Sequence, residues 1–163
     1  MTSWYAVRTK AKHEGVGARF AEARGVEIYL PVYLARRQWS DRVKVIEQPL
    51  FSGYFFARVD REERVKVLEA PGVVGVVGFG GEPAPIPEIE IENVRRLMKS
   101  GLPASPCPYV KVGDKVRIRS GPLVGMEGIL QKIKNRWRFI LTVDLLQKGV
   151  AVEVDSETVE AVR

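Results

Sequence analysis

The stretch Pro-Leu-Phe-Ser-Gly-Tyr-Phe-Phe-Ala-Arg-Val, residues 49–59, decides the fold of the N-terminal part of this chain. Aromatic and aliphatic side chains flank Gly53, and the aromatic and β-branched run after it is typical of a strand in the middle of a sheet. A second segment, GDKVRIRSGPLVGMEG from Gly113 to Gly128, predicts a strand, a glycine-punctuated loop and the start of another strand. Together the two segments indicate a two-part protein.

Around residues 49–59 the pattern predicts an α+β domain over residues 1–100, with a mixed, mostly antiparallel sheet flanked by helices. Alternating apolar and polar residues predict strands at 4–10, 28–35, 43–50, 53–59 and 73–79. Helices are predicted at 13–24, 61–69 and 87–99. The spacing of Val16, Phe20 and Ala23 marks one apolar face of the first helix, and Val65 and Leu68 are expected to face inward from the second.

The composition changes after Ser100. Residues 101–108 contain prolines at 103, 106 and 108, and this segment is predicted to be a short, stiff linker. Beyond it, residues 109–163 show only strand patterns, including strict alternation at 115–119 and 150–155. Several short strands in so few residues predict a small all-β, SH3-like barrel.

Composition argues against an enzyme. His13 is the only histidine and Cys107 the only cysteine of the 163 residues, so neither a catalytic triad nor a zinc site can be assembled, and no metal or other cofactor is expected. The single cysteine fits a reducing cytoplasm, and neither an export signal nor a membrane-spanning run is visible. The net charge of +6 favours acidic partners, including nucleic acid.

The chain resembles the NusG family of transcription elongation and antitermination factors. In the N-terminal part the resemblance rests on Trp4-Tyr5, Pro31, residues 49–54, Pro71-Gly72-Val73 and residues 83–86. In the C-terminal part, Gly113-Asp114, Gly121-Pro122-Leu123, Gly125 and Glu127-Gly128 resemble a KOW domain. Residues 145–154 and the Pro-Cys-Pro-Tyr segment are more similar to specialised paralogues of the UpxY and LoaP type.

The resemblance implies that an apolar depression on the N-terminal domain binds the β′ clamp helices of RNA polymerase. The matching residues are Trp4, Tyr5, Phe51, Gly53 and Tyr54. Partly exposed aromatic side chains beside a glycine supply the large contact area of interface anchors. The alternative is that these aromatic residues fill the core between the sheet and its helices, an alternative favoured for Trp4.

The tip of the hairpin expected at residues 28–50 carries cations around a tryptophan. These residues are Arg36, Arg37, Trp39, Arg42 and Lys44. Arginine suits phosphate groups and tryptophan stacks on exposed bases, so non-template DNA is an expected partner, and the resemblance adds the polymerase lobe. The alternative is a solvated hairpin whose charges keep the protein soluble.

The glycine-rich loop of the KOW segment is a further candidate contact. Its residues are Gly121, Pro122, Leu123, Gly125, Met126 and Gly128. In relatives this surface binds termination factor Rho or a ribosomal protein, although here Leu123 replaces the bulky aromatic residue typical of the loop. The structural alternative is that the glycines serve turns and bulges.

We therefore expect a monomeric, cytoplasmic, non-catalytic factor that binds RNA polymerase and suppresses pausing or termination, as a specialised paralogue. One alternative is a general elongation factor of the same family. Another, from a different class, is a KOW-type protein that binds RNA or the ribosome.

Overall fold

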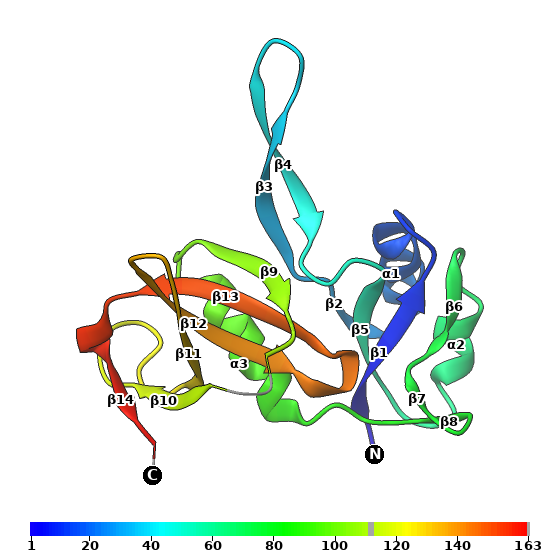
Figure 1. Cartoon of the computed structure of the whole chain (residues 1–163). Coiled ribbons are helices and arrows are strands. Elements are labelled where there is room, and N and C mark those ends of the chain that lie inside the picture. Colours follow the sequence, from blue (N-terminus) through cyan, green and yellow to red (C-terminus); the bar gives the residue numbers. More distant parts are fainter. Residues whose placement is uncertain (111–112, 163) are drawn as a thin grey trace. The chain divides into compact units, whose positions relative to one another are not determined.

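The computed structural model describes residues 1–110 and 113–162 of the chain (Figure 1). Residues 111, 112 and 163, which belong to the predicted barrel, lie outside the described part. Contacts divide the chain into two compact units, Met1–Glu88 and Ile89–Arg163. The N-terminal domain was expected to extend to residue 100. In the structure, residues 89–99 of the third helix group with the C-terminal strands instead.

The first unit is built on a four-stranded antiparallel sheet in the order β2-β5-β1-β6. Its strands are β1 (Ser3–Thr9), β2 (Glu27–Tyr29), β5 (Tyr54–Val59) and β6 (Val73–Val76). The central pair, β1 and β5, runs in continuous register from Ser3 opposite Val59 to Arg8 opposite Tyr54. The prediction that residues 53–59 form a central strand is therefore confirmed.

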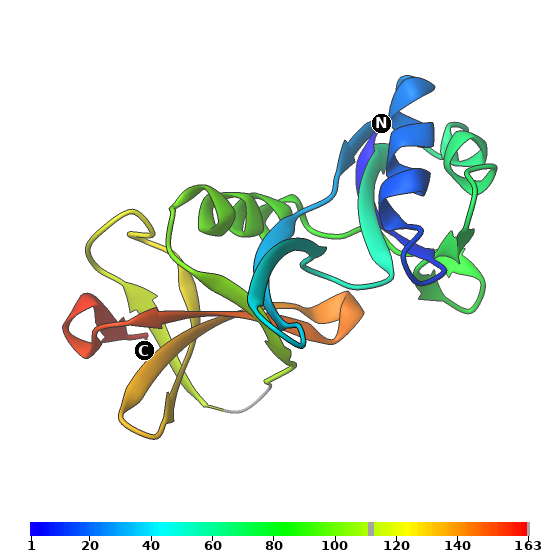
Figure 2. The ribbon, with the colours of Figure 1, turned by 90° about the horizontal axis from the view of Figure 1, so that it is seen from above.

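Helices α1 (Glu14–Ala23) and α2 (Arg64–Leu68) lie on one side of β1 and β5 (Figure 2). The core on this side contains Val7, Phe55 and Ala57 from the strands, with Ala18 of α1 and Val67 of α2 among the helical residues.

The predicted inward face of α2 was wrong, and the apolar face marked on α1 is also largely exposed. Val16 and Phe20 are 41% and 36% exposed, and Val65 and Leu68 are 55% and 48% exposed. Instead α1 turns its small residues to the sheet, because a side chain at Gly17 would stand only 3.1 Å from the Phe55 ring. The close approach of the α1 backbone to the sheet sets the orientation of the helix, and Phe20 is left partly exposed as a result.

A hairpin of β3 (Val32–Gln38) and β4 (Val43–Pro49) connects β2 to β5. Its two strands pair over their whole length, from Val32 opposite Pro49 to Gln38 opposite Val43. A second, very short ribbon consists of β7 (Gly78–Phe79) and β8 (Glu82–Pro83).

The second unit contains α3 (Glu88–Lys99), except for its first residue, and a six-stranded sheet in the order β14-β10-β11-β12-β13-β9. The strands are β9 (Ala104–Pro108), β10 (Asp114–Ile118), β11 (Glu127–Ile133), β12 (Arg136–Val143), β13 (Lys148–Val154) and β14 (Val159–Ala161). Two 3₁₀ turns, η1 (Asp144–Leu146) and η2 (Ser156–Thr158), join the last strands. The predicted all-β C-terminal region is confirmed.

The predicted linker is wrong for residues 104–108, which form strand β9. This strand pairs with β13, with Ala104 opposite Val152 and Pro108 opposite Lys148. Prolines lack the N–H that a central strand needs, but β9 lies at the edge of the sheet and needs donors toward only one neighbour. An edge position reconciles a proline-rich sequence with strand structure.

Candidate functional site

The four-stranded sheet of the first unit has two chemically different faces. The register places Trp4, Ala6 and Arg8 of β1 opposite Arg58, Phe56 and Tyr54 of β5. Directly opposite residues share a face, and this face is the one that α1 and α2 do not cover. We call it the aromatic face, defined by Trp4, Tyr29, Phe51, Tyr54 and Phe56.

Three rings of the aromatic face, those of Tyr29, Phe51 and Phe56, contact one another. Phe51 meets Phe56 edge-on with 5.6 Å between ring centroids, and Tyr29 stacks on Phe56 at 6.3 Å. The guanidinium carbon of Arg8 lies 5.9 Å from the centroid of the Tyr54 ring. Phe51 is 2% exposed and Phe56 is fully buried, whereas Tyr54 is only half-buried. Of the two residues that flank Gly53 in the predicted site, Tyr54 is therefore the accessible one.

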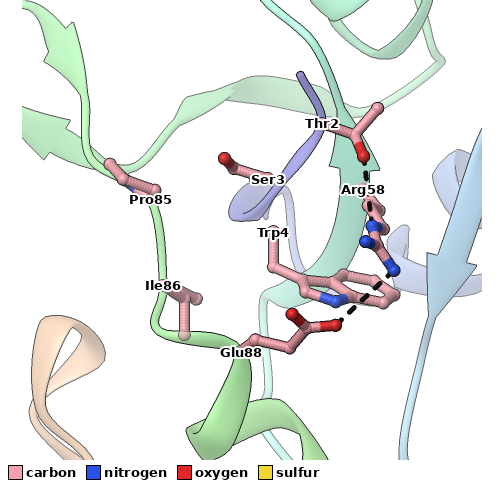
Figure 3. A pocket seen from close by; sticks show the side chains of 7 residues that line it. All are labelled: Thr2, Ser3, Trp4, Arg58, Pro85, Ile86 and Glu88. Atoms are coloured by element: carbon pink, nitrogen blue, oxygen red, sulfur yellow. Dashed lines mark hydrogen bonds and ion pairs between the residues drawn. The ribbon is translucent and has the colours of Figure 1, made fainter.

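Trp4 lines a small pocket of about 110 Å³ in the first unit. Figure 3 shows its indole beside Arg58 and Glu88, whose charged groups are 3.6 Å apart, with Pro85 and Ile86 across from them. Arg58 Nε also donates to the Thr2 hydroxyl at 3.2 Å. Trp4 itself is 2% exposed. Its burial agrees with the structural alternative more than with a role as a surface anchor.

Tyr5 was expected beside Trp4 in the same depression, and the structure separates the two. Tyr5 lies opposite Ala57 and packs against the core on the helix side of the sheet. Consecutive residues of a strand point to opposite faces, so Trp4 and Tyr5 cannot both contribute to one side. Tyr5 is therefore not part of the aromatic face.

A tight turn presents Phe51 and Tyr54. Tyr54 N–H donates to the Phe51 carbonyl at 3.0 Å, and Gly53 has φ of +85°. Ser52 is not among the residues of positive φ, so the turn is of type II, which favours glycine at its third position. The glycine of the predicted site is required by the backbone of this turn.

The β3–β4 hairpin brings most of the predicted cationic site together. Arg37 lies opposite Lys44, and the Lys44 ammonium is 4.5 Å and the Arg42 guanidinium carbon 5.8 Å from the centroid of the Trp39 ring. Trp39 is 47% exposed. Arg36 pairs with Val45 instead and occupies the other face of the hairpin. One face therefore offers three cations around an exposed indole.

The KOW loop was predicted to contact a partner through Leu123 and Met126, but these side chains are only 1% and 2% exposed. Gly121 and Gly125 have φ of +89° and +87°, which confirms the structural alternative of turn positions. A side chain at Gly128 would stand 2.6 Å from the Phe139 ring, so this glycine is needed for packing.

Helix α3 also holds this loop, since Arg96 donates to the carbonyls of Pro122 and Val124 at 3.3 and 3.0 Å. Val124 is 52% exposed and is the accessible apolar side chain of the loop.

A polar cluster ties the start of α3 to the second unit's sheet. The Glu90 carboxylate accepts a hydrogen bond from Asp144 N–H at 3.2 Å, and the Tyr109 hydroxyl donates to Asp144 Oδ1 at 3.0 Å. Burial raises the pKa of Glu90, and the nearby Asp144 charge adds to the rise, against the lowering effect of the backbone hydrogen bond. The pKa of Tyr109 is also raised, chiefly because its hydroxyl donates to Asp144.

The profile of the NusG family, described as transcription termination factor nusG, matches residues 2–95. The chain belongs to the NusG family. Similar relatives are the NusG transcription termination/antitermination proteins of Staphylococcus aureus and Staphylococcus carnosus, 28% and 27% identical to it. Each alignment covers 96% of this chain and 94% of the relative.

The solved structure of NusG from Thermotoga maritima matches the fold of the whole chain. The TM-score is 0.58 with 24% identity, and the match covers 100% of this chain and 98% of that one. The expected fold class is confirmed. The NusG family comprises transcription factors and no enzymes, so this member is a non-catalytic transcription termination/antitermination factor.

The described residues, 1–110 and 113–162, contain no group of three or more histidine, cysteine or acidic side chains placed to hold a metal ion. In the same part of the chain, no helix has the length and apolar character needed to cross a membrane.

Sequence reasoning missed Tyr29, Phe56 and Arg8. For two of them the signal was the alternation of side chains along a strand: Phe56 lies two residues after Tyr54, and Arg8 lies four residues after Trp4, so each shares a face with its partner. The register between the two strands, which brings both sets of side chains to one face of the sheet, was not predictable from either strand alone.

Proposed function

We propose that this NusG-family factor binds RNA polymerase through the aromatic face of its N-terminal sheet, with the β′ clamp helices as its docking element. The observation that carries the proposal is the gathering of Tyr29, Phe51, Tyr54 and Phe56 on the face that carries neither α1 nor α2. Tyr54, held at a turn and half-buried, is the anchor, and the buried rings of Phe51 and Phe56 belong to the same face. The factor acts in the cytoplasm as a monomer.

The mechanism is non-catalytic. A protein that binds one clamp conformation more tightly than another shifts the population toward that conformation. By bridging the DNA channel, the bound factor disfavours paused, open-clamp states and so suppresses pausing or termination. The size of the effect is limited by the difference in affinity between the two clamp states.

Photo-cross-linking tests this docking. A benzophenone amino acid at position 54 should cross-link to the β′ clamp helices in a transcribing complex, as mapped by mass spectrometry. The same group at position 20, on the outer side of α1 and 36% exposed, is the matched control and should not. Cross-links from position 54 that fall elsewhere on polymerase, or none at all, would contradict the proposal.

The hairpin face of Arg37, Trp39, Arg42 and Lys44 contacts the non-template DNA strand beside the polymerase lobe. Its support is the stacking surface of Trp39 with Lys44 and Arg42 near the ring, a combination suited to an exposed base and its phosphates. Arg37 and Lys44, like charges directly opposite, also favour an anionic partner.

In a salt titration with single-stranded DNA, Arg37→Ala with Lys44→Ala should weaken binding and reduce the salt slope by about 1.4. Arg36→Ala, on the other face, is the control and should change the affinity less. An unchanged slope in the double variant would remove the hairpin from the DNA site.

The C-terminal sheet recruits a second partner, a ribosomal protein or Rho, while tethered to the bound N-terminal unit.

We further propose a specialised role on particular operons, based on the composition of residues 145–154. Chromatin occupancy tests this role: signal at a few operons supports it, and signal across most transcribed genes would identify a general elongation factor.

A further inference from the structure

A buried carboxylate reaches the turn that carries the proposed anchor. Glu14, the first residue of α1, is only 3% exposed, which is unusual for a charged residue. Its Oε2 accepts a hydrogen bond of 2.8 Å from the backbone N–H of Gly53. None of the roles described so far uses this side chain.

The hydrogen bond fixes a peptide that would otherwise be poorly held. The Gly53 carbonyl accepts from Thr9 N–H at 2.8 Å, so the Gly53 residue is held on both sides, by α1 and by the end of β1. Gly53 adopts a positive φ, which glycine reaches readily. Glycine also has more conformational freedom to lose on folding than any other residue. Two hydrogen bonds from separate elements therefore restrict the residue that most needs restriction.

The position of Glu14 in the helix favours this role. A carboxylate in the first turn interacts favourably with the positive end of the helix dipole, which offsets part of the cost of burying it. A carboxylate also forms a stronger hydrogen bond with a backbone N–H than a neutral acceptor does.

We propose that Glu14 is a positioning residue for polymerase binding: it holds the Gly53 peptide and thereby sets the direction in which Phe51 and Tyr54 leave the turn. This inference rests on the proposed function of the aromatic face. In this inference α1, on the opposite side of the sheet, preorganises the turn that carries Tyr54 before polymerase binds.

Two conservative variants test whether polymerase binding depends on the length of the Glu14 side chain or on its charge. Glu14→Asp keeps the charge but is one methylene too short to reach Gly53, and should weaken polymerase affinity about tenfold. Glu14→Gln keeps the length and an acceptor oxygen; its hydrogen bond is weaker, so it should lose affinity by about threefold at most. Glu22→Asp, exposed on the same helix, is the matched control and should bind unchanged.

Further measurements distinguish positioning from a merely structural role. The Gly53 amide should exchange slowly in the original protein and in Glu14→Gln, and faster in Glu14→Asp, at temperatures where all three are folded. In a Tyr54→Ala background, Glu14→Asp should cause no further loss of affinity, because its effect passes through the turn. A structural residue alone would lower the unfolding midpoint and leave the affinity of the folded protein unchanged.

The inference would be overturned if folded Glu14→Asp bound polymerase as tightly as the unaltered protein does. It would also be overturned if Glu14→Gln lost as much polymerase affinity as Glu14→Asp. If the unaltered protein fails to bind polymerase, the proposed function fails, and the exchange rate of Gly53 still tests the anchoring. Fast exchange of the Gly53 amide in the unaltered protein would contradict the anchoring by Glu14. This measurement does not depend on whether Glu14→Asp folds.

Discussion

Replacing Phe51 by alanine should destabilise the N-terminal unit by about 3–5 kcal/mol. The magnitude follows from its surroundings: the side chain is 2% exposed and meets Phe56 edge-on at 5.6 Å. The aromatic pair accounts for about 0.5–1.5 kcal/mol of the total, and the lost burial and the cavity account for the rest. The sequence alone suggests that this substitution would remove polymerase binding and leave the fold intact; the burial of Phe51 predicts a cost to both.

Urea unfolding measures this cost. Replacing Trp39 and Trp137 by phenylalanine leaves Trp4 as the fluorescent reporter of the first unit. Phe20→Ala, at a site 36% exposed on α1, is the matched control and should cost less than about 1 kcal/mol. A double-mutant cycle with Phe56→Ala should give a coupling of about 0.5–1.5 kcal/mol. If Phe51→Ala costs no more than Phe20→Ala, the side chain is not packed in solution and the burial argument fails.

Three further outcomes follow from the geometry. Because the pKa of Glu90 is raised above its ordinary 4.5, the folded C-terminal unit binds that proton more tightly than the unfolded chain, so its stability falls as pH rises through the raised pKa. Glu90→Gln should flatten this decline above about pH 4.5 in thermal unfolding, and an unchanged pH profile would refute the assignment. Gly72→Ala should cost at least about 2 kcal/mol by urea unfolding, since φ is +79° and the new Cβ would lie 2.4 Å from that of His13; a loss below 1 kcal/mol would contradict the packing. Gly128→Ala should destabilise the C-terminal sheet by about 1–3 kcal/mol, whereas Gly75→Ala, with open space around it, should leave the other unit within about 1 kcal/mol.

The strands were predictable because alternation and β-branched or aromatic content act locally. Residues 53–59 carry that signal strongly, and β5 is found at 54–59 in the middle of its sheet. The helix faces were not predictable, because Val16 and Phe20 have helical spacing yet point outward. The close approach of α1 to Phe55 through Gly17 is a tertiary constraint that the helical period does not contain.

The candidate site shows the same division. The sequence indicates an aromatic cluster around Gly53, and the type II turn explains why glycine is needed there. It does not reveal that Trp4 and Phe51 are buried while Tyr54 stays partly accessible, because burial depends on strand register. Glu14 carried no signal at all, since its contact with Gly53 joins residues far apart in the chain.

The affinity of Tyr54→Ala for purified RNA polymerase, compared with that of Phe20→Ala, tests most directly whether the aromatic face is the docking surface. Both substitutions remove an aromatic ring that is partly accessible, from opposite sides of the same sheet. We predict a loss of about tenfold or more for Tyr54→Ala and an unchanged affinity for Phe20→Ala. Equal affinities for the two variants, or a loss confined to Phe20→Ala, would contradict the account.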